Sequence, residues 1–347
     1  MPFREPRLGI VYEHPHWFAP LFAELDRRGL PYDRIDVSRH RFDPVAGGAP
    51  WTVALNRMSP SAYLRGHGHT IPYTRELLRF LEGQNVDVIN GTRAFALETS
   101  KVGQLTLLHS LGLRAPRARV INHASQAALA AEGLTFPVVV KPNIGGSGAG
   151  VQRFETAEEV QAAASLGTID IGIDGTALVQ EFLPARDGHV VRVEVLGGRF
   201  LYAIKVYPNP DAGFNLCPAD ICQPDGVTAS APTVVPLAIS APGLSSDPVV
   251  ANLQKVALRV EGTTPPHDVV EDVLGIIAAG GLDIGGVEYL VNDRDGQVYY
   301  YDINALSNFV TDAPNIVGFD PYAILADYLE TRGQLPRRTV LGVTAAL

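Results

Sequence analysis

The sequence Gly286-Val287-Glu288-Tyr289-Leu290, followed by Tyr301-Asp302-Ile303-Asn304, decides which fold the chain can adopt. Turn-forming residues fill the interval between the two segments, and apolar, β-branched and aromatic runs joined in this way are typical of a hairpin. Alternate side chains of a strand share one face, so Asp302 and Asn304 point the same way and Glu288 can meet them. Two carboxylates and an amide oxygen suit Mg²⁺. A polar hairpin facing solvent is the alternative, but unpaired carboxylates inside such apolar strands would be costly.

The composition is that of a folded, acidic protein. The chain has 347 residues, 46% of them hydrophobic and 19% charged, which suits two or three packed α/β units with a buried core. Its net charge is −9 and no basic block occurs, so nucleic acid is not an expected partner. Neither a signal-peptide core nor an apolar run of membrane-spanning length is present, so we expect a cytoplasmic protein without a membrane partner. Cys217 and Cys222 could form a bridge, but in that compartment we expect a reduced pair.

Strand and helix patterns alternate at the start of the chain. We expect strands at 8–12, 32–37, 52–56 and 86–90, and helices at 16–29 and 74–82. This alternation predicts a mostly parallel sheet with crossover helices. No Gly-x-Gly-x-x-Gly follows the first strand, so a dinucleotide is not expected there. The pairs His14/His16 and His67/His69 could each hold a metal, although isolated surface histidines are commoner.

A glycine-rich segment follows the expected strand 137–142. Residues 145–150 include four glycines and Ser147, and Lys141 stands just before them. Free backbone N–H groups of such a loop can surround a phosphate, and a lysine at the strand end supplies compensating charge. The segment is not a Walker loop, because no Gly-Lys-Ser/Thr follows it, and an ordinary glycine-rich turn is the alternative. Lys101, in an expected helix from 93 to 112, is another of only four lysines in the chain.

The rest of the chain carries further charged candidates. A strand is expected at 177–184, and a hairpin of 190–196 with 199–206 carries Arg192 and Lys205. Helices are expected at 268–279 and 321–331. Between 208 and 266 the composition changes to Pro, Ala, Ser and Asp, with no Lys or Arg from 206 to 254. Long segments of this kind are usually functional or mobile, so we expect a lid or excursion.

In this order, the segments resemble the ATP-grasp superfamily, and most closely its RimK-like carboxylate–amine ligases. The resemblance covers about residues 92–309, and more weakly the N-terminal segment Leu55-Asn56-Arg57-Met58-Ser59. It rests on four motifs: Phe136-Pro137-Val138-Val139-Val140-Lys141-Pro142 with its glycine-rich loop, Val179-Gln180-Glu181-Phe182, Gly286-Val287-Glu288 and Asp302-Ile303-Asn304. The implied fold is α/β (α+β), with an N-terminal parallel α/β domain (1–92) and a two-lobed ATP-grasp fold. The small lobe with the glycine-rich loop would span 93–184. The C-terminal lobe, with the metal site and the excursion, would span 185–347.

The resemblance also implies a role for individual residues. The ATP phosphates would be bound by Lys101 and Lys141, and a flexible loop would close over them with Gly145, Gly146, Ser147 and Gly148. The strand beside adenine would supply Gln180, Glu181, Phe182 and Leu183. Asp187 would contact the ribose, and Asn215 would be a polar contact near phosphate. Arg192 would hold the γ-phosphate with support from Lys205. Glu288, Asp302 and Asn304 would hold two Mg²⁺ ions, with Mn²⁺ as a substitute.

The implied reaction is amide or peptide bond formation from a small carboxylic acid and an amine, through an acylphosphate. The sequence lacks the basic residues that glutamate ligases of this branch carry after the asparagine that Asn215 matches. We therefore expect an amino acid, a peptide or another small acid rather than glutamate transfer to a protein tail. An ATP-dependent small-molecule kinase of the same fold and a nucleotide-binding protein without turnover are the alternatives. A homo-oligomer is left open.

Overall fold

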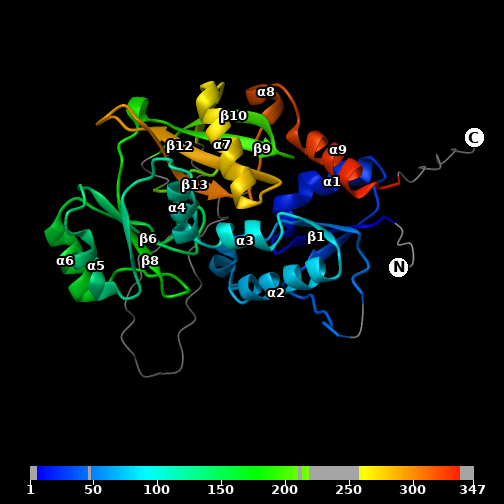
Figure 1. Cartoon of the computed structure of the whole chain (residues 1–347), viewed down its shortest axis with the longest axis horizontal. Helices are drawn as coiled ribbons and strands as arrows, with labels where there is room; N and C mark the ends of the chain where they lie inside the picture. The colour runs from blue at the N-terminus through cyan, green and yellow to red at the C-terminus, as the bar shows by residue number, and fades with distance from the viewer. Residues whose placement is uncertain (1–5, 46–47, 210–212, 219–257, 337–347) are drawn as a thin grey trace, which may run out of the picture.

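Three β-sheets organise the residues that the structure describes. The computed structural model covers residues 6–45, 48–209, 213–218 and 258–336. In Figure 1 the N-terminal sheet lies at the right, and two further sheets lie at the left and at the top. The segment from 219 to 257, and with it Cys222 and most of the expected excursion, lies outside the described residues. The expected reduced state of the cysteine pair therefore stays a prediction.

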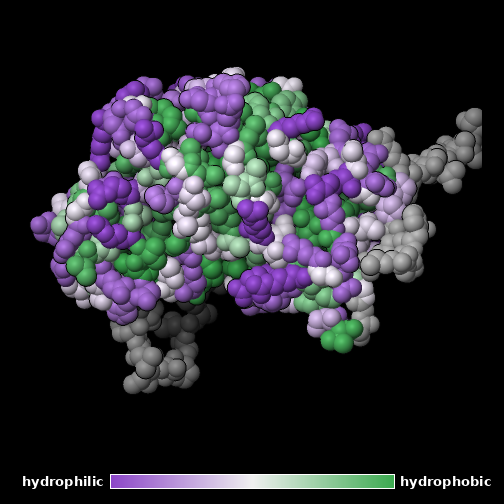
Figure 2. Space-filling model, in the orientation of Figure 1, coloured by the Kyte–Doolittle hydropathy of each residue, from purple (hydrophilic) through white to green (hydrophobic). Residues whose placement is uncertain are grey.

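The N-terminal sheet is entirely parallel, as the alternation predicted. Its strand order is β2-β1-β3-β4. The elements are β1 (Leu8–Tyr12), η1 (Pro15–Phe18), α1 (Ala19–Arg27), β2 (Tyr32–Asp36), β3 (Val53–Asn56), η2 (Pro60–Arg65), α2 (Thr70–Gly83) and β4 (Asp87–Ile89), where η marks a 3₁₀-helix. All residues of β1 are buried because helices cover both faces of the sheet. The outer face of α2 carries Arg75, Glu76 and Arg79, and Figure 2 shows the polar surface over this helix.

The expected single helix from 93 to 112 is wrong, because the chain forms two helices there. They are α3 (Thr92–Glu98) and α4 (Lys101–Ser110). The break arises at Ser100, whose hydroxyl accepts a hydrogen bond from the Gly103 N–H at 3.0 Å and so caps a new helix. Lys101 is therefore the first residue of α4 instead of an interior residue.

The second sheet is antiparallel and small, with strand order β5-β8-β6-β7. Its elements are β5 (Ala118–Ile121), η3 (Ala124–Gln126), α5 (Ala127–Ala131), β6 (Val138–Pro142), β7 (Gln152–Phe154), α6 (Ala157–Leu166) and β8 (Ala177–Glu181). Helices α5 and α6 contribute Ala127, Ala130, Val160 and Ala164 to the core of this lobe. The glycine-rich segment is the connection from β6 to β7, so the sheet holds both of its ends.

The third sheet is the largest and is also antiparallel, with strand order β11-β10-β9-β12-β13. The elements are η4 (Arg186–Gly188), β9 (Val190–Leu196), β10 (Arg199–Tyr207), β11 (Arg259–Thr263), α7 (His267–Gly280), β12 (Ile284–Val291), β13 (Val298–Asn304), α8 (Ala313–Val317) and α9 (Pro321–Gly333). Helix α7 packs on one face, and Figure 1 shows it crossing the sheet. β11 falls within the expected excursion, so residues 259–263 belong to the sheet.

Buried hydrogen bonds fix the N-terminal sheet to the large sheet. The side chain of Asn90 donates to the Ile284 carbonyl at 2.6 Å and to the Ala305 carbonyl at 2.8 Å, and accepts from the Asp283 N–H at 2.8 Å. Arg57 Nη2 donates to the Ser307 carbonyl at 2.6 Å. These contacts lie just before β12 and just after β13, so they hold the ends of the hairpin strands in place.

Candidate functional site

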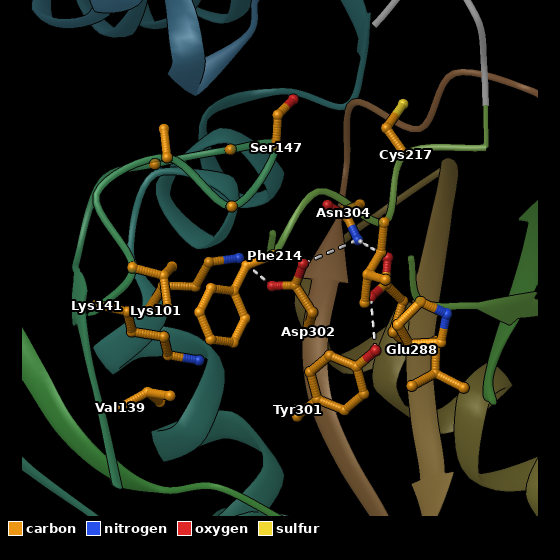
Figure 3. A pocket seen from close by; sticks show the side chains of 18 of the residues that line it. Lys101, Val139, Lys141, Ser147, Phe214, Cys217, Glu288, Tyr301, Asp302 and Asn304 are labelled. Carbon is orange, nitrogen blue, oxygen red and sulfur yellow. Dashed lines mark hydrogen bonds and ion pairs between the residues drawn. The ribbon is translucent and has the colours of Figure 1, made fainter. Parts of the chain in front are cut away.

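The hairpin predicted for residues 286–304 is present, and its register brings the acidic residues together. Glu288 is the direct partner of Asp302, and Gly286 is the partner of Asn304. Asn304 Nδ2 donates to Glu288 Oε1 at 3.4 Å and to Asp302 Oδ2 at 3.3 Å. The Tyr301 hydroxyl donates to Glu288 Oε2 at 2.9 Å. Figure 3 shows this group facing the lysines across a cavity.

A buried cation on β9 lies beside this group. Arg192 Nε donates to Glu194 Oε1 at 2.6 Å and Nη1 to Glu288 Oε1 at 3.4 Å. Nη2 donates to the Ser307 hydroxyl, which itself donates to Glu194. The guanidinium is fixed on three sides, because a planar fork of donors forms geometrically specific contacts. Its two carboxylate neighbours raise the pKa of Arg192 against the effect of burial.

Gly286 is needed because the Arg192–Glu194 pair passes over its Cα. A Cβ at this position would lie 2.8 Å from Glu194 Oε1 and 3.1 Å from Arg192 Nε. Real Cβ atoms essentially never come this close to another heavy atom without displacing it. The Gly-Val-Glu motif thus combines a gap for the buried ion pair with the carboxylate of Glu288 two positions later.

Two lysines face the carboxylates from the opposite wall. Lys101 Nζ forms an ion pair with Asp302, and the backbone N–H of Lys101 donates to the Asn143 carbonyl at 3.2 Å. Lys141 lies on β6 in the same cavity. Burial, together with the charge of Lys101, lowers the pKa of Lys141 to about 8. Lys141 therefore changes between its charged and neutral forms near pH 8. An anionic group placed beside it would stabilise the charged form.

The carboxylates respond to the same field in opposite ways. Burial and the charge of Asp302 raise the pKa of Glu288 to about 7. Burial also acts to raise the pKa of Asp302, but the charges of Lys101 and Lys141 outweigh it and the pKa falls below its usual value. Glu288 is thus short of positive charge in this arrangement, which a bound cation would supply.

Most of the expected residues line one cavity of about 650 Å³. Those brought together are Lys101, Lys141, Gly145, Gly146, Ser147, Gly148, Gln180, Glu181, Phe182, Leu183, Arg192, Glu288, Asp302 and Asn304. They come from α4, β6, the β6–β7 loop, β8 with the two residues after it, and the large sheet. Figure 3 shows Val139 towards one end and Ser147, Cys217 and Asn304 towards the other.

Three expected residues are not in the lining of this cavity. Lys205 pairs with Val191, whereas Arg192 pairs with Ile204, so Lys205 points to the other face of the sheet and does not support Arg192 as expected. Asp187 is an exposed residue of η4 with φ +58°. The Asn215 side chain accepts from the Cys217 N–H at 3.0 Å, while its neighbours Phe214 and Leu216 line the cavity.

Several lining residues were missed by sequence reasoning. Trp17, Ser59 and Ser61 bring the N-terminal domain into the cavity wall, and Glu98 does the same for α3. Ser59 belongs to the segment 55–59 on which the weak N-terminal resemblance rested, which was the one signal for this wall. Glu98 Oε2 accepts backbone hydrogen bonds from Ala305 and from Leu306, the latter at 3.2 Å.

Residues 213–217, apart from Asn215, line the cavity beside the glycine-rich loop, and the backbone of 214–215 contacts this loop at Gly148. Gly148 has φ +70°, and a Cβ there would lie 2.8 Å from the Asn215 nitrogen. Glycine is required on both counts, since this conformation disfavours other residues and the backbone of 214–215 leaves no space. Phe214 also meets Phe182 edge-on with ring centroids 6.4 Å apart.

The donor set fits a hard cation. Glu288, Asp302 and Asn304 present oxygen atoms from adjacent strands, provided the Asn304 amide turns its Oδ1 towards the carboxylates. Within the described residues no group of three or more Asp, Glu, His or Cys side chains forms a metal site. A cation held by these two carboxylates and one amide would need further ligands, and Mg²⁺ typically takes them from water and substrate phosphates.

Two lobes of antiparallel sheet that face one another across lysines and carboxylates define the ATP-grasp class of fold. The solved structure of the ATP-grasp ligase PsnB, complexed with a minimal precursor, has this fold: it matches with TM-score 0.63 and 17% identity over 95% of this chain and 100% of that chain. Residues 99–216 match the family of the RimK-like ATP-grasp domain. This match and the shared fold confirm the resemblance and the predicted fold class.

Relatives of known name share part of the sequence. A D-alanine–D-alanine ligase from Geobacter sulfurreducens is 30% identical over 119 residues, which are 34% of this chain and 36% of that protein. A probable α-L-glutamate ligase from Pasteurella multocida is 25% identical over 204 residues, 58% of this chain and 64% of that protein. The chain thus aligns with between about a third and two thirds of these relatives' length. No helix in the described part of the chain has the length and apolarity to cross a membrane.

Proposed function

We propose that the protein is an ATP-dependent carboxylate–amine ligase that forms an amide bond through an acylphosphate. The observation that carries the proposal is the meeting of Lys101, Lys141 and Arg192 with Glu288 and Asp302 in one cavity. The lysines on one wall and Arg192 on the other suit phosphate oxygens, and the carboxylates beside Arg192 suit the metal ions that accompany them. The partial matches to ligases that join amino acids support the same class of reaction.

The nucleotide would lie with its base between Val139, Phe182 and Leu183 and its phosphates beside the glycine-rich loop. Lys101 and Lys141 would contact the phosphates, and Arg192 would hold the transferred group. Glu288, Asp302 and Asn304 would hold Mg²⁺, two ions in the full complex and replaceable by Mn²⁺, which neutralises charge on the phosphates. Asp187 and Asn215 stay candidates for ribose and phosphate only if the loops that carry them move.

The acid would lie against the N-terminal wall. Ser61 Oγ and Ser59 Oγ are 2.8 Å apart, Arg65 donates to Ser61 Oγ, and the Ser61 N–H donates to Ser59 Oγ. One hydroxyl donates to the other, so the pair keeps one proton to donate towards the cavity that both residues line. An acceptor oxygen of the acid substrate matches that single donor.

The proposed chemistry has two steps. An oxygen of the acid attacks the γ-phosphorus of ATP, the bond from phosphorus to the bridging oxygen breaks, and ADP leaves. The amine nitrogen then attacks the acyl carbon, the carbon–oxygen bond to phosphate breaks, and the amine loses a proton to water. Arg192 and the lysines stabilise charge on the transferred group, so positioning and electrostatics carry the catalysis.

The substrates we favour are a small acid, such as an amino acid or a peptide, and an amine. No lysine or arginine occurs from 206 to 254, so a polyanionic protein tail would find no cationic anchor in that part of the sequence. We place the reaction in the cytoplasm, where ATP is available. Whether the enzyme is a homo-oligomer is a question for sedimentation.

The test is trapping of the acylphosphate. The protein is incubated with ATP, Mg²⁺, hydroxylamine and a panel of amino acids and peptides, with acid-free reactions as controls. We expect ADP and an acyl hydroxamate to form in equal amounts with the accepted acid. ADP with a stable phosphorylated product would indicate a kinase, and bound ATP without ADP formation would indicate a protein that only binds nucleotide. Either result contradicts the proposal.

A further inference from the structure

Gln104 forms a side-chain bridge to the strand that carries the proposed metal ligands. Its Nε2 donates to the Ile303 carbonyl at 2.7 Å, and its Oε1 accepts from the Ile303 N–H at 3.2 Å. Nε2 also donates to the Leu97 carbonyl at 3.1 Å, and the side chain is 1% exposed. Ile303 lies between Asp302 and Asn304, so the amide of Gln104 holds the backbone from which both ligands project.

This contact answers a structural need of β13. The strand is at the edge of the large sheet, with β12 on one side and no strand of the described chain on the other. At the edge, the N–H and C=O of alternate residues point outwards and must find partners. The amide of Gln104 has the same donor and acceptor as a peptide group, so it pairs with Ile303 as a further strand would.

The same short helical region fixes the neighbouring positions of the cavity. One turn before Gln104, Lys101 forms the ion pair with Asp302. Glu98, at the end of α3, accepts from the backbone of Ala305 and Leu306. Asn143, where the glycine-rich loop begins, accepts from the Val102 N–H at 3.0 Å. The start of α4 therefore contacts both the loop and the edge of β13.

We propose that Gln104 is a positioning residue for the divalent metal: by bridging Ile303 it sets the spacing and direction of Asp302 and Asn304. It touches neither nucleotide nor metal, and the inference rests on the proposed nucleotide-binding function. Partners that orient metal ligands typically change metal affinity by about 10-fold to 100-fold when removed. The effect of Gln104 should therefore be much larger in the binding of MgADP than in the binding of ADP alone, where only its 3.5 Å contact with Lys101 Nζ acts.

The experiment measures ADP affinity by calorimetry, with Mg²⁺ and in EDTA, for the wild type and for Gln104→Met. Methionine keeps the length and apolar contacts but has neither hydrogen bond to Ile303. Mg²⁺ should raise the affinity of the wild type for ADP, and we expect this gain to fall by about 10-fold or more in Gln104→Met. The affinity for ADP in EDTA should fall much less. Gln104→Glu places a carboxylate oxygen against the Ile303 carbonyl that Nε2 contacts, so its loss of the Mg²⁺ gain should be at least as large. Thr106→Ala, an exposed change on the same helix, is the matched control.

Two further readouts separate positioning from loss of fold. The electron paramagnetic resonance spectrum of bound MnADP should broaden in Gln104→Met, and amide hydrogen exchange should rise at Ile303 and its neighbours. An unchanged Mg²⁺ gain in Gln104→Met would overturn the inference and leave the proposed function intact. A wild type that binds ADP equally with and without Mg²⁺ would overturn the inference together with the metal site. Equal losses with and without Mg²⁺ would show a merely structural role and would also overturn it.

Discussion

The two walls of the cavity are built by opposite means. The wall from the large sheet consists of charged side chains on adjacent strands, and Arg192, Glu194 and Glu288 in it are almost wholly buried. The opposite wall consists of a glycine-rich loop and two lysines that retain partial exposure. Fixed charges keep ligands in register, and a glycine-rich backbone can adopt the conformations that a closing loop needs. Changes to the two walls should therefore fail in different ways.

The largest effect should come from Asp302→Asn on the fixed wall. Removing this charge takes away a metal ligand and leaves Lys101 without its anionic partner. Turnover, measured as ADP release with the accepted acid, should fall by on the order of 10²–10³-fold, as is common when one strong electrostatic contact is lost. The circular dichroism spectrum should be unchanged, which would show that the fold survives. Normal turnover of Asp302→Asn would contradict the metal site.

Lys141→Ala tests the wall of the two lysines and the glycine-rich loop. Here the loss of nucleotide affinity should exceed the loss of stability. A charge-assisted hydrogen bond to phosphate typically contributes about 1.5–3 kcal/mol, so ADP affinity should fall by about 10-fold to 100-fold. Calorimetry measures this directly, with Arg79→Ala on the exposed face of α2 as the control. Unchanged affinity would remove Lys141 from the nucleotide site.

Gly286→Ala should lower the free energy of unfolding without removing any charge from the large-sheet wall. The new Cβ would displace Glu194 or Arg192, and overpacking of this kind costs about 1–3 kcal/mol of stability. The matched control is Gly275→Ala in α7, where a Cβ would meet nothing within 4 Å. That change should stabilise the helix by about 0.5–1 kcal/mol. Urea unfolding of both variants decides the point, and equal stabilities would contradict the close approach.

The smallest effect should be a pH dependence of ADP affinity that arises from Lys141. The pKa of Lys141 is lowered to about 8, so the side chain is charged below this pH and neutral above it. ADP interacts with the charged form, so its affinity in EDTA should fall as pH rises from 7.5 to 9.5, by less than about 10-fold per pH unit. Lys141→Arg should remove the dependence, because arginine stays charged. A flat wild-type profile would mean that phosphate does not contact Lys141.

Local patterns were sufficient to predict much of this site. The alternation in 301–304 placed Asp302 and Asn304 on one face, and glycine content located the loop. The helix boundary near Lys101 was harder to predict from the sequence, although Ser100 is a residue type that commonly begins a helix. That missed boundary concealed the roles of Glu98 and Gln104, which depend on where α4 starts.

Other features depend on register and on distant contacts. The placement of Lys205 was wrong because a shift of one residue in strand pairing moves a side chain to the other face. Pairing of β9 with β10 is irregular between Phe200 and Tyr202, which no local pattern predicted. Trp17, Ser59 and Ser61 reach the cavity only through the packing of one sheet against another, so their part in it required the structure.

The low basicity of Lys141 has a practical consequence. An amine that is neutral near pH 8 is a better nucleophile at that pH than one with an ordinary pKa, and the chain has only four lysines to compete for a reagent. Among the lysines, a mild acylating agent should therefore favour Lys141, and occupancy of the cavity should protect it. Protection of Lys141 from acylation, measured by mass spectrometry, would then rank candidate substrates before any product is known.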